Sequence, residues 1–245
     1  MKKFILLTTL CLLLLVPEES EAAIASVTTA SWQETGATTY TESFNNTGAA
    51  TDLLIVGVAL WSDTVDTITY NGENLTQRMA RNQSGYHDLE IWTLGDGSIA
   101  TGANNLVIGT FAANRNMTWG ATILSGAVGD SFNAGGSDGA SGGSYSGQNM
   151  TMTTLVDNSW HVSLHANGGL RTHSSVDSTE LYDQANTTNG GQSAMYYQLK
   201  ATAGSVTNTV VFSGAPTDER AGVSMEVKVA AAAAPAVKKQ SEIFF

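Results

Sequence analysis

The apolar positions of this chain fall in short runs that alternate with polar, Gly/Asn/Thr-rich stretches. The most apolar run, residues 52–61 (DLLIVGVALW), carries no charge after Asp52. Its Val and Ile content and its length are typical of a strand that is buried on both faces. We therefore predict that residues 52–61 form the central strand of the fold.

Alternate residues of a strand point to opposite faces of its sheet. One face of this strand is aliphatic throughout and is expected to lie in the core between two sheets: Leu54, Val56, Val58 and Leu60. The other face includes the small residues Gly57 and Ala59 and needs a cover of its own. A loop, the N-terminal segment or a second subunit could supply it, so this face is also the expected place for an oligomer contact.

Other segments alternate in the same way. Residues 67–70 precede the hairpin signal Asn71-Gly72, and residues 159–166 and 221–229 follow the two-residue period of a half-buried strand. The pattern predicts about ten to thirteen strands and no helix after the N-terminus. We expect one antiparallel β-sandwich over residues 23–230.

The order of several motifs is similar to a known group of proteins. The motifs DLLIVGVALW, TITYNGENLT, LEIWTL, NNLVIGTF, WGATILSGAV and DNSWHVSLHA occur in this order between residues 52 and 229. Together they resemble bacterial and phage-borne β-sandwich domains of largely uncharacterised role, jelly-roll or concanavalin-like in general form. The resemblance implies a sandwich with a surface or extracellular role, and it carries no catalytic residue onto this chain.

The N-terminus has the pattern of a secretory signal peptide. Lys2 and Lys3 precede a 13-residue apolar run, residues 4–16, and small residues follow at Ser20 and Ala22. The run is shorter than the roughly 20 residues that span a membrane. We predict cleavage after Ala22, a secreted or cell-surface protein without a membrane span, and a flexible Ala-rich tail over residues 231–245.

Composition narrows the range of partners. Charged residues make up 13% of the chain and the formal net charge is −11; removal of residues 1–22 would leave −10. Such an acidic protein repels phosphate backbones, so nucleic acid and anionic membrane surfaces are disfavoured. The single cysteine, Cys11, lies in the predicted signal peptide. The mature domain therefore lacks disulfides and thiolate chemistry.

Two carboxylates are the best candidates for catalysis. Asp88 and Glu90 lie two residues apart, so both point to one face of a strand, and Trp92 follows on the same face. Glycosidases use a carboxylate pair, often beside an aromatic platform for the sugar. The alternative is that both carboxylates are solvated at the start of a strand.

Metal binding receives weaker support. His161 and His165 share a strand face, but positions four apart on a strand are about 13 Å apart, too far for one zinc ion, which favours a solvated polar face. Calcium prefers hard oxygen ligands. The Gly/Ser-rich segment 129–149, expected to be irregular, offers the candidates Asp130, Asn133 and Asp138. Otherwise we expect no cofactor.

Three tyrosines lie in polar segments expected to be loops, and exposed aromatic rings beside Asn, Asp and Gly are typical of sugar-binding surfaces. The candidate ligand-binding residues are Tyr86, Trp92, Tyr145 and Tyr182. We therefore predict an exported, non-enzymatic binding or adhesion module whose favoured ligand class is glycan. Two alternatives stay open: a structural or assembly protein of a cell surface or virion, and a glycan-active hydrolase that uses Asp88 and Glu90.

Overall fold

The computed structural model describes residues 23–230, apart from residues 62, 83–86, 96, 110–114, 189–190 and 215–216. The predicted signal peptide, the predicted tail and Tyr86 lie outside the described residues. Within this part of the chain there are strands and turns but no helix, and hence no helix long and apolar enough to cross a membrane.

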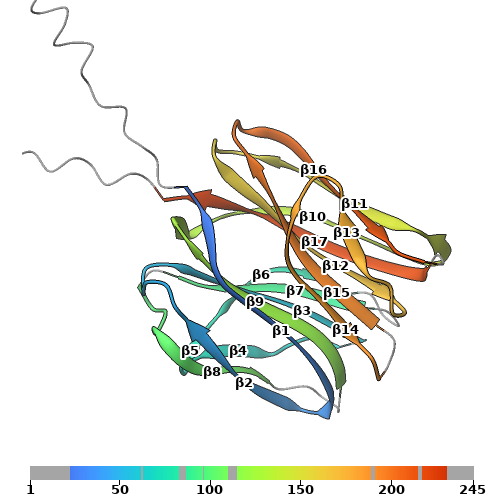
Figure 1. Ribbon diagram of the computed structural model, residues 1–245, viewed down its shortest axis with the longest axis horizontal. Coiled ribbons are helices and arrows are strands. Elements are labelled where there is room, and N and C mark those ends of the chain that lie inside the picture. The colour runs from blue at the N-terminus through green and yellow to red at the C-terminus, as the bar shows by residue number, and fades with distance from the viewer. Residues whose placement is uncertain are drawn as a thin grey trace, which may run out of the picture.

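Seventeen strands of the described chain form four antiparallel sheets, stacked one above another (Figure 1). Each sheet is named here after one of its inner strands. The lowest in Figure 1, the β8 sheet, has the order β2 (Thr39–Asn46), β8 (Gly102–Gly109), β4 (Thr67–Tyr70), β5 (Glu73–Asn74). The next, the β3 sheet, has the order β1 (Ala25–Ala37), β9 (Arg115–Ser125), β3 (Leu53–Trp61), β7 (His87–Leu94), β6 (Thr76–Arg81).

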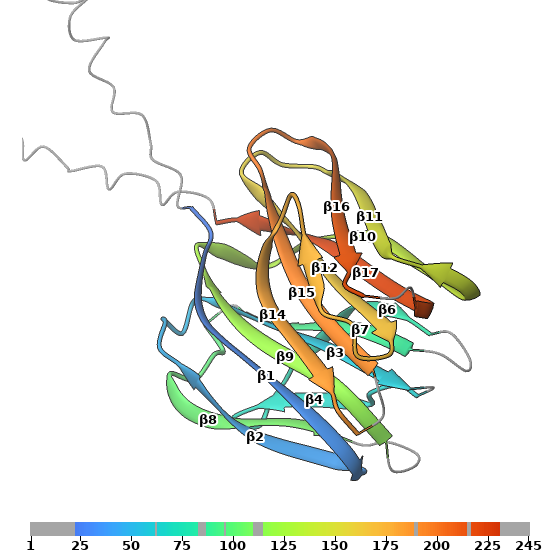
Figure 2. The ribbon, with the colours of Figure 1, turned by 45° about the vertical axis from the view of Figure 1, so that its right-hand side comes forward.

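The other two sheets come from the second half of the chain and keep their place in the stack when the molecule is turned (Figure 2). The β12 sheet has the order β10 (Ala127–Tyr145), β17 (Thr217–Val229), β12 (Ser159–Gly168), β15 (Gly191–Lys200), β14 (Thr179–Asn186). The β16 sheet has the order β11 (Gly147–Thr154), β16 (Gly204–Phe212), β13 (His173–Ser175). The all-β, antiparallel prediction is confirmed, although the strands are more numerous than the ten to thirteen expected.

Part of the excess comes from residues 129–149, for which the prediction of an irregular segment is wrong. This segment lies almost entirely in β10 and β11, and β10 pairs with β17 through three register shifts. Its Gly/Ser-rich composition is typical of a loop. Pairing with the amphipathic strand β17 overrides that local preference, because β propensity depends strongly on tertiary context.

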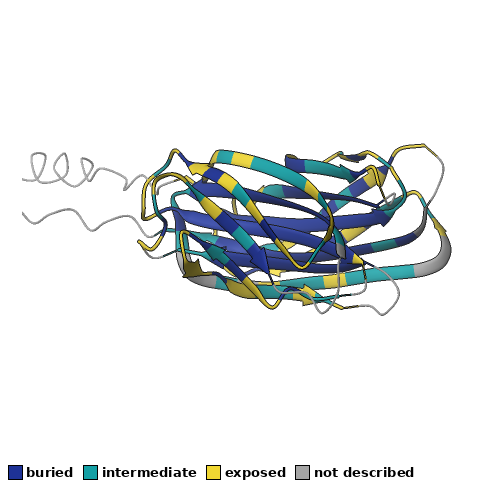
Figure 3. Ribbon diagram, turned by 90° about the horizontal axis from the view of Figure 1, so that it is seen from below, coloured by how far each residue is buried: buried dark blue, intermediate teal, exposed yellow. Residues whose placement is uncertain are grey.

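The strand β3 lies at the centre of the fold, as predicted, and its aliphatic face is buried. Leu54, Val56, Val58 and Leu60 are fully buried and belong to the core between the β3 and β8 sheets, which Phe44, Ile68 and Leu106 complete from the other side. Their burial removes apolar surface from water, the dominant favourable contribution to folding. The inner strands are accordingly dark blue in Figure 3, while the outer strands carry the exposed residues.

The second face of β3 is covered by a third sheet of the same chain. Leu53, Ile55 and Ala59 pack in a common core with Val162 and Leu164 of β12. The expected cover, a loop, the N-terminal segment or a second subunit, is therefore corrected to the β12 sheet. Since this sheet already fills the face, the face no longer points to an oligomer contact.

Two glycines determine how closely these sheets approach. Gly57 of β3 and Gly120 of β9 are direct neighbours across the strands, and the ring of Tyr182 from β14 lies against them. A Cβ on Gly120 would lie 2.4 Å from Cδ1 of this ring, and one on Gly57 would lie 2.3 Å from Cε of Met195. The Tyr182 hydroxyl donates to Gly57 O at 3.1 Å. We call this arrangement the glycine slot.

The interface between the β12 and β16 sheets differs from the other two because it is largely polar. The β12 side chains on this face are fully buried: His161, Ser163, His165 and Asn167. The apolar cluster beside them is small and consists of Ala194, Tyr196, Val210 and Phe212. The expectation that the β12 histidines lie on a solvated face is therefore wrong, because a fourth sheet covers them.

Candidate functional site

The structure buries the carboxylates proposed for catalysis. Glu90 is fully buried and accepts hydrogen bonds from Val65 N at 3.0 Å and from Trp92 Nε1 at 2.7 Å. Burial raises the pKa of this carboxyl group. Asp88 is only 4% exposed. The β8 sheet covers this face of β7, since Trp92 belongs to the core between the two sheets, so neither an exposed catalytic pair nor a Trp92 sugar platform is formed. The Glu90 carboxylate instead holds the backbone of Val65 against the sheet through this hydrogen bond.

Tyr182 is also misplaced by the sequence prediction. It lies in β14, is 4% exposed and fills the glycine slot, so it is a core residue and not a surface ligand-binding residue. The polar residues around it suggested a loop, but they form the edge strand β14, whose pairing with β15 shifts in register between Glu180 and Tyr182. Tyr86 lies outside the described residues.

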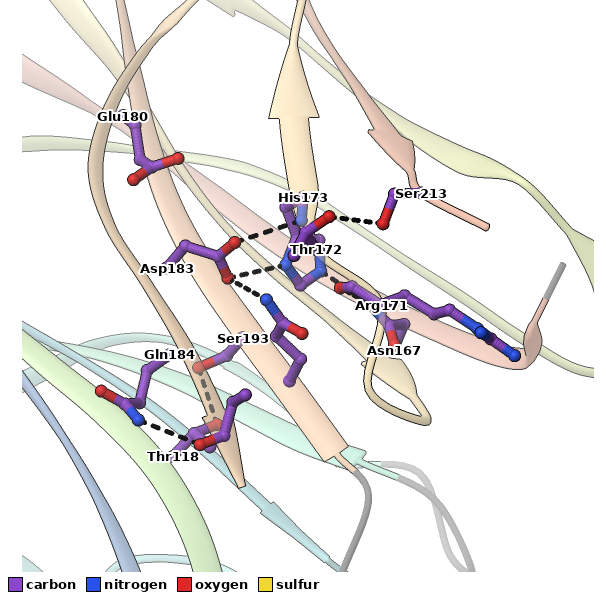
Figure 4. A network of polar contacts seen from close by, with 12 residues as sticks. Thr118, Asn167, Arg171, Thr172, His173, Glu180, Asp183, Gln184, Ser193 and Ser213 are labelled. Atoms are coloured by element: carbon purple, nitrogen blue, oxygen red, sulfur yellow. Dashed lines mark hydrogen bonds and ion pairs between the residues drawn. The ribbon is translucent and has the colours of Figure 1, made fainter. Parts of the chain in front are cut away.

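A pair made of the partly buried Asp183 and the buried His173 joins the β12 and β16 sheets (Figure 4). Asp183 contacts His173 Nδ1 at 3.1 Å and accepts a hydrogen bond from Gln192 Nε2 at 2.5 Å. Burial acts to raise the pKa of Asp183, but the hydrogen bonds from His173 and Gln192 outweigh it and lower that pKa. The Asn167 side-chain Nδ2 lies 2.9 Å from His173 Nε2, within hydrogen-bonding distance. The imidazole is therefore engaged on both nitrogens and is not placed to activate a hydroxyl nucleophile.

The metal candidates do not converge. His165 contacts Ser163 and the amide of Gln148, each at 3.0 Å, and the described residues contain no group of three or more His, Cys, Asp or Glu side chains that could hold a metal ion. Of the calcium candidates, Asp138 pairs with Arg220 at 3.1 Å. The side chains of Asp130 and Asn133 lie outside the described part of the structure.

Two predicted residues, Tyr145 and Asp138, do meet in one cavity, which we call the Tyr145 groove. It has a volume of about 520 Å³ and is lined by Asp138, Tyr145, Gln148, Asn149, Thr209 and Arg220 among others. The Arg220 guanidinium lies over the Tyr145 ring, 4.9 Å from its centroid. Sequence patterns missed Arg220 because nothing near it distinguishes it from an ordinary surface charge.

A second cavity, the Tyr197 pocket, was not predicted. Its volume is about 750 Å³, and it lies where β14 begins beside the ends of β12 and β15. Tyr197 stacks on Trp160 with ring centroids 3.6 Å apart and an interplanar angle of 6°. The polar side of the pocket is made by Asn158, Asp177, Ser178, Thr179 and Gln198. The pocket therefore combines a flat aromatic ring with several hydrogen-bonding groups.

The Asp177 carboxylate of the Tyr197 pocket is held in place. The hydrogen bonds that described residues make to the Asp177 carboxylate all use Oδ1: from Ser175 Oγ at 3.0 Å, Ser178 Oγ at 3.1 Å and Thr209 N at 3.1 Å. Oδ2 of this exposed residue accepts no hydrogen bond from a described residue. Gln198 Oε1 is buried and has no donor among the described residues. Because this atom is closed to solvent, it is also closed to a ligand, and the exposed Asp177 carboxylate is the accessible acceptor that the structure orients here.

Comparison with family models, curated proteins and solved structures finds no match to this chain. Function is therefore argued from the geometry of these two cavities.

Proposed function

We propose that this chain is an exported, non-enzymatic β-sandwich module, of the jelly-roll or concanavalin-like kind, that binds glycans in the Tyr197 pocket. The N-terminal sequence pattern supports export. The observation that supports glycan binding is the Tyr197–Trp160 stack beside the oriented Asp177 carboxylate.

The chemistry of the pocket fits a sugar. An aromatic ring packs against the C–H face of a pyranose, while carboxylate and amide groups bind its hydroxyls. Because Trp160 backs the Tyr197 ring and three donors orient Asp177, little conformational entropy is lost on binding. The lining of this pocket holds an acidic side chain and no basic one among its described residues. Neutral sugars are therefore favoured over anionic ones.

Replacing Tyr197 by alanine is expected to weaken glycan binding at least about tenfold, which corresponds to about 1.4 kcal/mol. Tyr197→Phe keeps the ring and should bind within about twofold of wild type. A glycan array with residues 23–245 would identify the oligosaccharide, and calorimetry would measure its affinity for each variant. Thr151→Ala, on the outer face of the β16 sheet, is the matched control.

Because Tyr197 also packs on Trp160, Asp177→Asn provides a second variant that leaves the aromatic stack intact. It should weaken binding without lowering the melting temperature. Unchanged affinity in both Tyr197→Ala and Asp177→Asn would contradict the assignment of this pocket. An array without any bound glycan, with and without calcium, would contradict glycan binding itself.

A role in surface assembly is the second candidate, favoured by the outer faces of the stack. The exposed β11 and β16 residues are uncharged and lie in register, and Thr151 and Thr207 share a hydrogen bond of 2.8 Å. The outward residues of β2 are Thr39, Thr41, Ser43 and Asn45. Flat, uncharged faces permit stacking of copies without charge repulsion. Concentration-dependent oligomers in light scattering would support assembly, and a monomer at all concentrations would exclude it.

A further inference from the structure

We infer that the Tyr145 groove is a second carbohydrate site, so that one chain bridges two glycans. This inference rests on the proposed function of the Tyr197 pocket and extends it to a second place on the same pair of sheets. The two cavities have no lining residue in common.

The two cavities lie at opposite ends of strand β12. Trp160, near the first residue of this strand, lines the Tyr197 pocket. Arg220 of the Tyr145 groove pairs with Asn167, near the last residue of the same strand. Seven residues of extended strand separate these two positions, a distance of about 23 Å. The linings do meet at one point, where Thr209 N of the groove donates to Asp177 Oδ1 of the pocket at 3.1 Å. The separation of about 23 Å therefore applies to the Trp160 end of the pocket and the Arg220 end of the groove.

The Tyr145 groove is built around a fixed guanidinium group. Arg220 contacts Asp138 Oδ2 at 3.1 Å, donates to Gly147 O at 3.1 Å and lies over the ring of Tyr145. These three contacts hold the planar donor group in one orientation before any ligand arrives. Pre-organised donors of this kind lose less side-chain freedom on binding than flexible ones do.

The charge balance of the groove indicates the same class of ligand as in the first site. The Asp138 carboxylate offsets the Arg220 charge, and both side chains are partly exposed. The pair thus offers one acceptor and one donor, while Asn149 and Thr209 add neutral hydrogen-bonding groups. Adjacent donors and acceptors suit the hydroxyls of a neutral sugar better than an isolated anion, which Asp138 would repel.

Two separate sites on one folded chain give the protein a property that a single site lacks. A monomer can then link two glycan chains, or two distant positions of one long chain. On a multivalent surface, the second contact forms at a high effective concentration, so avidity exceeds the affinity of either site. Bridging of this kind does not require an oligomer.

The test uses residues 23–245 as wild type, Tyr145→Ala, Tyr197→Ala, the double variant, and Thr41→Ala, an exposed β2 residue away from both cavities, as the control variant. Calorimetry with a short oligosaccharide chosen on the array gives the stoichiometry, and beads coated with this sugar report cross-linking. Light scattering verifies that each protein is monomeric, and circular dichroism verifies its fold. We expect two sugars per wild-type chain, one per single variant, none in the double variant, and agglutination by wild type and the control alone.

The outcomes separate the two claims. One alternative outcome is that wild type binds one sugar per chain, with binding abolished by Tyr197→Ala and unchanged by Tyr145→Ala. This result would overturn the second site and support the first. If wild type binds a single sugar, and only Tyr145→Ala abolishes that binding, the groove would be supported. Both the Tyr197 pocket and bridging would then be overturned. Agglutination by monomeric Tyr145→Ala would overturn bridging through the groove. No binding by wild type to any sugar would overturn both claims.

Discussion

Replacing Gly120 by alanine is expected to destabilise the fold by about 3 kcal/mol, the upper part of the range for overpacking a core. The added Cβ would lie 2.4, 2.5 and 2.7 Å from three atoms of the Tyr182 ring. An aromatic ring cannot bend away as a flexible side chain can, and its hydroxyl is fastened to Gly57 O. To accept the methyl group, the ring must leave the glycine slot and give up that hydrogen bond. Urea unfolding followed by tryptophan fluorescence measures the loss.

Two further variants separate this mechanism from a general cost of alanine. Gly57→Ala meets mainly the mobile end of Met195, so it should cost less than Gly120→Ala. Tyr182→Ala removes the ring and should itself cost about 3–5 kcal/mol. In that background Gly120→Ala should cost almost nothing, because the clash is gone. Additive effects of the two substitutions would show that the glycine slot is not the cause.

Acidification from pH 7 to pH 4 is expected to remove about 3 kcal/mol of stability through His161 alone. This side chain is completely buried, and neither ring nitrogen has a hydrogen-bond partner among the described residues. Burial lowers its pKa from 6.5 to about 4, although nearby Asp177 acts to raise it. Between these two pH values the unfolded chain binds a proton that the folded chain does not. Stability is thus fully present above pH 6.5 and is lost as the pH falls toward 4.

Other buried ionisable groups also change the stability in acid. Burial also lowers the pKa of His165, with the charges of His173 and His161 acting in the same direction, so His165 adds to the loss in acid. Glu90 acts oppositely, because burial raises its pKa and its protonation favours the folded state.

His161→Leu provides the test of this mechanism. Leucine removes two unsatisfied polar atoms, so the variant should be more stable than wild type by about 1–3 kcal/mol at pH 7. Its stability should also change less between pH 7 and pH 4. Urea unfolding at pH 7.5, 5.5 and 4.5 gives both quantities. A variant that is folded at pH 7 but keeps the wild-type pH dependence would rule out His161 as the source.

The central strand could be predicted because its information is local. Residues 53–61 are apolar on both faces, and this property alone requires two covers. The nature of the second cover could not be predicted, since it depends on the pairing of β12 with β15 and β17. The same four-sheet stack explains the errors at His161 and Tyr182. His161 lies in an alternating segment, but alternation does not say whether another sheet covers the polar face. Tyr182 lies in a polar segment that resembles a loop, and only its pairing in β14 turns it into the core.

The candidate sites were predictable only in part. Tyr145 and Asp138 carried a compositional signal, an aromatic residue and an acid within a Gly/Ser-rich segment. Arg220 comes from a strand about 75 residues later, so only the register of β10 with β17 brings it to them. The Tyr197 pocket gathers residues from β12, β15 and the start of β14. No spacing of residues along the sequence links these three segments. In addition, Tyr197 lies in β15, whose apolar sequence predicts a buried strand and not a binding site.

The glycine slot also has a consequence for how the chain folds. The hydrogen bond that closes it joins Gly57 to a residue 125 positions further along the chain. Contacts this far apart in sequence form slowly, because a long loop must close before they contribute any free energy. Until then, residues 53–61 present an uncharged, β-prone stretch that readily pairs with other chains. Self-association during refolding should therefore begin at β3, and a faster closure of the β12 sheet would suppress it.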